Sequence, residues 1–247
     1  ALYTSAGTAD KNIAIGYNTM KGALVTGADN IGVGQLALDA LLGGANNIAL
    51  GKQAAEELTT GSDNIAIGLT AMGAGITTGD SNIGIGSNAL DDLTSGTDNV
   101  AIGSNASDGT TTAADTIAIG HDAMSGAITT GNNNIAIGKL ALKLAVGASN
   151  NIGIGYRALR DTSDTAARNI AIGDQVAFDG VLTGLDNIIM GTETAAAATS
   201  LAQNVIIGHK AVLTGVMTGD NNTVLGPEAA QIITSGADNV IIGHNAG

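Results

Sequence analysis

The chain has no cysteine and no tryptophan, and it contains one phenylalanine and one proline. Without cysteine it can form neither a disulfide nor a thiolate metal site. Aromatic residues make up 2% of the 247 residues, which excludes a globular core built around large side chains. A collagen triple helix is also excluded, because the 37 glycines come without abundant proline. The core must therefore consist of small aliphatic side chains.

Basic residues are scarce as well: nine Lys and Arg against 22 Asp and Glu give a net charge of −13 at pH 7. This charge disfavours binding to nucleic acid or to an anionic membrane surface. No apolar run approaches the roughly 18 residues that a membrane helix needs, so no membrane insertion is expected. The apolar share of 44% is nevertheless too high for a disordered chain. Small aliphatic residues are expected to pack repetitively.

A motif of the form N-I-A-I-G recurs along the whole chain. It occurs fourteen times, and successive copies are 17 or 18 residues apart. Asn opens every copy except one, in which Thr116 takes its place. Such a fixed period is the signature of a repeat architecture. The motif glycines are Gly16, Gly34, Gly51, Gly68, Gly86, Gly103, Gly120, Gly138, Gly155, Gly173, Gly191, Gly208, Gly226 and Gly243.

The period of the motif predicts the fold class. Large apolar residues alternate within residues 12–16, which is the period of a β-strand. A unit of 17–18 residues has room for two short strands and two turns, which make one solenoid coil. Stacked coils would pair their backbones in parallel at about 4.8 Å per coil. We therefore predict an all-β, parallel β-solenoid (β-roll) of about 14 coils that forms a single repeat domain over residues 1–247, a segment of a longer fibre protein.

The alternation also assigns side chains to the two faces of the strand. Placing the larger residues inside directs Ile13 and Ile15 into the coil, opposite Ala37, Leu38 and Leu42-type residues of the second strand. The Asn column is then expected to form a ladder of side-chain amides between coils or to cap each turn. Ligand binding by this Asn column is the alternative.

In this assignment the middle residue of each strand faces outward. It is Ala or Gly in the first ten motifs and Ile or Val in the last four. A continuous apolar strip of this length is typical of an interface, so we expect this face to pack against copies of itself around an axis. The predicted oligomer interface is represented by Ala14, Ala66, Ala118, Ala171, Ile189, Ile206, Val224 and Ile241.

The pattern N-I-A-I-G-x-x-A-L…T-T-G-x-x-N is similar to the head repeats of trimeric autotransporter adhesins. It resembles still more closely the repeats of phage and other viral tail-fibre proteins. Residues 64–82, with Ile65-Ala66-Ile67-Gly68, are the nearest match, and the resemblance covers essentially the whole chain. It implies a trimeric, left-handed parallel β-roll displayed outside a cell or on a virion. The matching positions are structural, so the resemblance assigns no receptor-binding residue.

Catalytic chemistry is not expected from this sequence. His121, His209 and His244 each follow a motif glycine, at outward corners of the predicted coils. No triad and no acid–base pair of carboxylates stands out, so we predict no catalytic, cofactor-binding or metal site. Several aspartates precede the Asn column, and turn formation explains them better than calcium binding does. These aspartates are Asp29, Asp63, Asp98, Asp115, Asp186 and Asp238.

Five of the nine basic residues lie between positions 139 and 168. On successive coils they would form a belt that contacts an anionic surface sugar. The preferred alternative is pairing with Asp161, Asp164 and Asp174 on neighbouring coils or chains. The belt consists of Lys139, Lys143, Arg157, Arg160 and Arg168.

The leading functional hypothesis is a structural segment of a phage or viral tail fibre or of a bacterial surface adhesin. Such a homotrimeric, extracellular rod would project or form a host-attachment surface, with a cell-surface receptor or glycan as its partner. An ice-binding solenoid is the alternative, because rows of threonine could stack along one face. A polysaccharide-acting solenoid is less favoured, since the chain has only three tyrosines as sugar platforms. The threonine pairs are Thr59-Thr60, Thr77-Thr78 and Thr129-Thr130.

Overall fold

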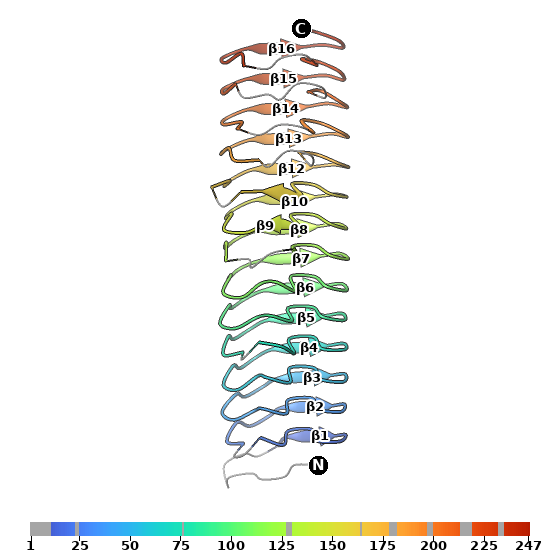
Figure 1. Ribbon diagram of the computed structural model, residues 1–247, viewed down its shortest axis with the longest axis vertical. Coiled ribbons are helices and arrows are strands. Elements are labelled where there is room, and N and C mark those ends of the chain that lie inside the picture. Colours follow the sequence, from blue (N-terminus) through green and yellow to red (C-terminus); the bar gives the residue numbers. More distant parts are fainter. Residues whose placement is uncertain are drawn as a thin grey trace. The chain divides into compact units, whose positions relative to one another are not determined.

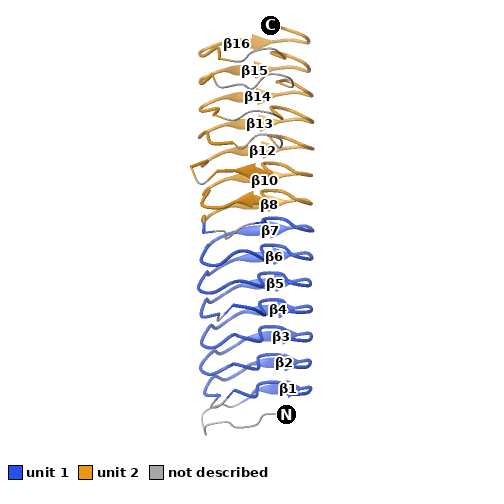
Figure 2. Ribbon diagram, viewed as in Figure 1, with its two compact units in different colours: residues 1–130 blue, residues 131–247 orange. Residues whose placement is uncertain are grey.

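The structure is a computed structural model of the chain. It describes residues 11–22, 25–75, 77–126, 130–163, 165–177, 182–196, 200–212, 219–231 and 235–247. The chain divides into two compact units, residues 1–130 and residues 131–247 (Figure 2). Strands and turns make up the regular structure of the described residues, which contain no helix.

The first unit is a stack of parallel strands, each contributed by one repeat (Figure 1). Neighbouring strands pair in register, so that Ile13 lies opposite Ile31 and Ala14 opposite Gly32. Equivalent residues of successive repeats therefore form straight columns. The strands of the described part of this unit are β1 (Ile13–Ile15), β2 (Ile31–Val33), β3 (Ile48–Leu50), β4 (Ile65–Ile67), β5 (Ile83–Ile85), β6 (Val100–Ile102) and β7 (Ile117–Ile119).

The second unit repeats this arrangement and adds a short sheet on another side of the coil. Leu144 pairs with Asp161 there, between consecutive coils. The main strands are β8 (Ile135–Ile137), β10 (Ile152–Ile154), β12 (Ile170–Ile172), β13 (Ile188–Met190), β14 (Val205–Ile207), β15 (Thr223–Leu225) and β16 (Val240–Ile242), and the short sheet consists of β9 (Leu144–Ala145) and β11 (Asp161–Thr162).

The predicted all-β parallel solenoid with 17–18-residue repeats is confirmed. The number of turns is about twelve rather than fourteen, because the seven main strands described in each unit are joined by six pairings. Each sequence motif corresponds to one strand, whereas a full turn runs from one strand to the strand that pairs with it. The single domain over residues 1–247 stays a prediction.

The second strand predicted for each coil is largely replaced by turns. In the described residues only β9 and β11 lie on this side of the coil as strands. In most coils the second and fourth residues after the motif glycine take positive φ, as Leu36 (62°) and Leu38 (54°) do. The backbone still bonds from coil to coil, since the Leu38 amide donates to the Ala54 carbonyl at 3.1 Å. These inter-coil bonds stabilise a left-handed conformation that is costly for non-glycine residues.

The predicted inward and outward faces of the strand are reversed in the structure. In β4, Ala66 is fully buried, whereas Ile65 and Ile67 are half-buried and lie on the outer face. Where Leu and Met side chains from the opposite wall fill the interior, it is too narrow for isoleucine at the strand centre. A Cβ added to Gly84 would lie 3.2 Å from Met72 Cγ, and one added to Gly153 would lie 3.2 Å from Leu142 Cγ.

The second wall agrees with the sequence prediction in part. Ala37 and Leu38 are fully buried, as expected. The prediction for Leu42 is wrong, since Leu42 is 40% exposed and Leu41 is the buried residue. This wall is formed by a turn with two positive-φ residues. The two-residue alternation of a strand therefore does not predict which of its side chains face inward.

Candidate functional site

The Asn column is a buried ladder of side-chain amides. Asn64 Nδ2 donates to Asn47 Oδ1 at 3.1 Å and to the Gly79 carbonyl at 2.9 Å, and the Asn64 backbone amide donates to the same Oδ1 at 3.0 Å. The Thr116 hydroxyl continues the column with a 2.6 Å bond to Asn99 Oδ1. Because these donors are engaged inside the chain, the column stabilises coil stacking and offers little to a ligand.

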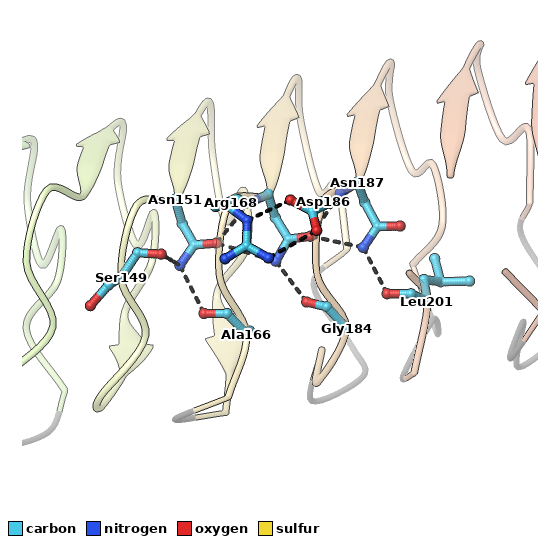
Figure 3. Close-up of polar contacts among 9 residues, drawn as sticks. Ser149, Asn151, Ala166, Arg168, Gly184, Asp186, Asn187 and Leu201 are labelled. Carbon is cyan, nitrogen blue, oxygen red and sulfur yellow. Dashed lines mark hydrogen bonds and ion pairs between the residues drawn. The ribbon is translucent and has the colours of Figure 1, made fainter. Parts of the chain in front are cut away.

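Figure 3 shows the same arrangement in the second unit. Asn151 donates to the Ala166 carbonyl at 3.1 Å, and Asn187 donates to the Leu201 carbonyl at 2.7 Å. Each amide thus joins the start of a repeat, just before its strand, to the turn that ends the same repeat. The predicted ladder is confirmed.

The residues predicted as the oligomer interface lie inside the coil. Six of the eight have no exposed surface: Ala66, Ala118, Ala171, Ile189, Ile206 and Val224. Ala14 and Ile241, in the first and last described strands, are half-buried on the same inner side. None of the eight is placed to contact another chain through the outer sheet face, because the strand faces are reversed.

The outer sheet face instead carries the first and third residues of each main strand. We call this surface the isoleucine face. In the first unit all fourteen of its residues are Ile, Val or Leu, and all are partly or largely exposed. They are Ile13, Ile31, Ile48, Ile65, Ile83, Val100 and Ile117 in one row, and Ile15, Val33, Leu50, Ile67, Ile85, Ile102 and Ile119 in the other.

The second unit has its own isoleucine face. Thr223 is its one polar residue among the main strands described, and none of the fourteen is buried. Within a unit the strands pair in register, so the exposed side chains of one row are neighbours at about 4.8 Å. The rows are Ile135, Ile152, Ile170, Ile188, Val205, Thr223 and Val240, and Ile137, Ile154, Ile172, Met190, Ile207, Leu225 and Ile242.

Exposure of this face persists in coils with neighbours on both sides. Ile102 is 38% exposed in the first unit, and Ile207 is 38% exposed in the second. Single exposed apolar residues are common, but a contiguous apolar patch of this extent is typical of a protein interface. The isoleucine face is therefore the candidate interaction surface on the described part of the chain.

The five residues of the predicted basic belt do not share one environment. Arg168 forms two hydrogen bonds with Asp186 of the following coil, at 2.6 and 2.9 Å (Figure 3). This contact raises the pKa of Arg168 and lowers the pKa of Asp186. Lys139 is exposed at the corner after its motif glycine. These two residues lie outside the pocket described next.

Lys143, Arg157 and Arg160 line a pocket of about 380 Å³ in the second unit, together with Leu140, Leu144 and Asp161. Arg160 pairs with Asp161 at 2.7 Å, as predicted, although the two are adjacent in the chain rather than on neighbouring coils. Asp164 lies outside the described residues. The sequence analysis did not predict the two leucines as part of this site. They could have been found from the repeat, because Leu140 and Leu144 occupy the same repeat positions as Arg157 and Asp161.

The aspartates before the Asn column lie in the left-handed turn conformation. Asp63 has a φ of 59°, and Ser81 and Arg168 have φ values of 61° and 57° at the equivalent position. Asp and Asn adopt this conformation more readily than most residues, which explains their frequency there. The three histidines are exposed, and His121 Nδ1 lies 3.0 Å from Asp122.

A different set of aspartates is partly buried in the first unit. Burial raises the pKa of Asp108, and the charges of Asp92, Asp122 and Asp91 raise it further. Burial also raises the pKa of Asp91, with a contribution from Asp92. The described residues contain no group of His, Asp or Glu arranged to hold a metal ion.

In the pair Thr77-Thr78 only one side chain faces outward, so the pair contributes to one outer row at most. The Thr77 side chain is fully buried, and its hydroxyl donates to the Leu93 carbonyl at 3.0 Å, whereas Thr78 is exposed. Thr129 lies outside the described residues. No helix within the described ranges is long and apolar enough to span a bilayer.

No protein-family model matches the chain, and no curated protein matches it significantly.

Proposed function

We propose that the chain is a structural, self-associating segment of an extracellular fibre, of the tail-fibre or surface-adhesin type, and that it has no catalytic activity. The observation that carries this proposal is the isoleucine face. Two rows of apolar side chains cover the outer sheet face of each unit, in a chain with a net charge of −13. A second copy of the same chain carries apolar rows with the same spacing, so it is the partner that fits this surface.

The free energy of apolar burial favours association through this face. Completing the burial of a half-exposed Ile or Val gains about 1 kcal/mol, from about 25 cal/mol per Å² of apolar surface. The fourteen such residues of the first unit then gain about 14 kcal/mol, near the upper end of the 4–15 kcal/mol that association typically costs, and the face of the second unit adds to this gain. The face is thus large enough to hold an assembly together without contacts elsewhere.

The arrangement in two rows supports a trimer. Around a three-fold axis, each chain contacts two neighbours, and the first-residue row of one chain can pack against the third-residue row of the next. Such heterologous contacts close into a ring when the rotation is 120°. A homotrimer of parallel coils would remove both rows from water and leave the charged turns outside. This assembly would present host-attachment surfaces on its outer walls.

The absence of cysteine from the chain makes accessibility measurable at single sites. Ile102→Cys places one thiol on the isoleucine face, at a residue 38% exposed in the single chain. Thr60→Cys places one at an exposed residue outside that face. We expect the thiol at position 102 to react about ten-fold more slowly with a maleimide than the thiol at 60, because interface cores exclude water.

Mild denaturant supplies the control for this experiment. Protection at position 102 should disappear when the assembly dissociates, while the rate at position 60 stays the same. Equal rates for the two variants at high concentration would contradict the proposal, because the isoleucine face would then be open to solvent.

A further inference from the structure

The basic pocket of the second unit is a feature that coil stacking does not require. It is formed by the second, fifth and sixth residues after two consecutive motif glycines, Gly138 and Gly155. The second positions are Leu140 and Arg157, the fifth are Lys143 and Arg160, and the sixth are Leu144 and Asp161. We infer that this pocket binds a negatively charged saccharide unit, carboxylated or sulfated, and so gives the proposed adhesive segment a ligand site of its own.

The charge at this repeat position in the pocket is opposite to its charge in the first unit. In the first unit, the fifth position after the motif glycine is acidic in four repeats: Asp39, Glu56, Asp91 and Asp108. Around the pocket the same column holds Lys143 and Arg160. Three cationic side chains and one carboxylate line the pocket, a net charge of +2, in a chain whose net charge is −13. A local reversal of this kind attracts anions that the rest of the surface repels.

One donor among the residues that line the pocket has no partner in the described structure. Arg157 Nε is buried and has no hydrogen-bond partner in the described structure. The Arg157 guanidinium lies 4.9 Å from the centre of the Tyr156 ring, which holds its plane. A buried donor without a partner is costly, and an anion with several acceptor oxygens would satisfy it.

Two further contacts shape the other side of the pocket. Arg160 is oriented by Asp161, which accepts bonds from its Nε at 3.1 Å and its Nη2 at 2.7 Å. The pairing of β9 with β11 fixes Leu144 beside Asp161. The cationic groups are therefore attached to backbone that is hydrogen-bonded between coils, rather than to a free loop.

Size and the apolar wall narrow the ligand class. A volume of about 380 Å³ is at the lower end of small-molecule sites, which suits one or two sugar rings. Leu140 and Leu144 offer an apolar wall to the C–H face of a ring. Arginines bind carboxylate and sulfate oxygens in bidentate geometry, whereas a neutral sugar would leave the net charge of the pocket uncompensated.

The chain supplies a matched pair of variants for the test. Arg157→Gln removes a pocket cation, and Gln53 and Gln175 already occupy this position in other repeats with φ values of 59° and 54°. Arg168→Gln removes a cation outside the pocket, and Gln203 occupies its equivalent position with a φ of 59°. Both substitutions change the charge by the same amount and use a residue that the coil accepts, so folding is preserved in each.

Binding of the full chain would be measured by calorimetry with a sialylated trisaccharide, a uronic-acid tetrasaccharide, a sulfated disaccharide and neutral lactose, and with inorganic sulfate alone. We expect binding to at least one acidic saccharide and none to lactose. Arg157→Gln should weaken that binding about ten-fold, the effect of losing one charge-assisted contact, and Arg168→Gln should leave it within two-fold.

Four results would overturn the inference: no binding to any acidic saccharide, equal binding of lactose, equal weakening by both variants, and binding of inorganic sulfate as tight as that of the saccharides. The third would indicate unspecific charge attraction, and the fourth a site for small anions only. The mass of each variant in solution would be measured alongside. A trimer that binds no saccharide rejects this inference alone, whereas saccharide binding by a monomer rejects only the proposed assembly.

Discussion

The motif glycine is the residue that most tightly constrains each coil. Gly103 has a φ of +133°, and a Cβ at this position would lie 2.6 Å from the carbonyl oxygen of Gly120 in the next coil. The backbones of successive coils approach each other here too closely for any side chain. The sequence indicates this role directly, because the glycine recurs in all fourteen motifs.

Gly103→Ala is therefore expected to destabilise the chain by about 3 kcal/mol or more, from the strained backbone and the displaced carbonyl together. Urea denaturation followed by circular dichroism would measure the free energy of unfolding. Gly43→Ala is the matched control, since a Cβ there meets nothing closer than 3.8 Å and the residue is exposed. Equal effects of the two variants would show that the close approach of the coils does not limit this position.

The partly buried aspartates make stability depend on pH. A carboxyl whose folded pKa is raised above 3.8 binds more protons in the folded than in the unfolded chain, between 3.8 and the raised value. The free energy of unfolding then falls as pH rises through that window, and the loss is complete at neutral pH. Asp108→Asn should remove this loss and stabilise the chain at pH 7, with no gain below pH 3.8.

Unfolding of this variant and of the parent would be compared at pH 7 and at pH 3.5. Asp115→Asn is the control: Asp115 is exposed, and Asn133 and Asn150 occupy its equivalent position. The lowered pKa of Asp186 acts in the opposite direction, but it is present in all the proteins compared. A variant no more stable than the Asp115→Asn control at pH 7 would contradict the account of Asp108.

At the scale of the element, the three-residue strand could be located from the sequence but not oriented. The alternation in Ile13-Ala14-Ile15 identifies a strand, and β1 spans those residues. The two faces, however, follow from the width of the coil, which depends on side chains from the opposite wall. One local signal was present: Asn12 and Ala14 share a face, and the buried Asn ladder fixes that face as the inner one.

The opposite wall of the coil explains why the middle residue of each main strand changes from Ala or Gly to Ile or Val along the chain. From Ala14 to Ala171 the buried centre is Ala or Gly, and most repeats have Leu or Met four residues after the motif glycine. At Ile189, Ile206 and Val224 the centre is β-branched, and the residues of the opposite wall become smaller, as at Ala195. The interior volume is conserved while the two walls exchange large and small residues, as close packing requires.

This exchange predicts coupling between the two walls. Ile206→Ala should cost about 2–4 kcal/mol, the usual effect of a buried cavity. Adding Ala195→Leu, at a positive-φ position where Leu38 and Leu90 occur naturally, should recover part of the loss. A double-mutant cycle in urea would measure the coupling. Strictly additive losses would indicate that the two positions do not share one space.

The pocket shows the limit of sequence reasoning at this scale. The clustering of basic residues between positions 139 and 168 was visible, but their distribution over pocket, corner and turn depends on the phase of each residue within its repeat. Lys143 and Arg160 share a phase, whereas Arg168 occupies the turn before the Asn column. Only the coil geometry separates the residues that line the pocket from the residue that pairs with Asp186.

At the scale of the whole molecule, the chain combines an acidic composition with an apolar outer sheet face on each unit. The net charge of −13 and the exposed turns favour solubility, whereas the isoleucine face favours association. The sequence predicted an apolar outer sheet face but assigned it to the wrong residues of the same strands. Self-association through the outer rows is the claim from which the proposed function follows.

Sedimentation equilibrium of the unmodified chain, over a hundred-fold range of concentration, tests that claim most directly. The account predicts a mass three times the 24.1 kDa of one chain, stable on dilution and insensitive to salt, because the contact is apolar. A mass of 24.1 kDa at every concentration would contradict it.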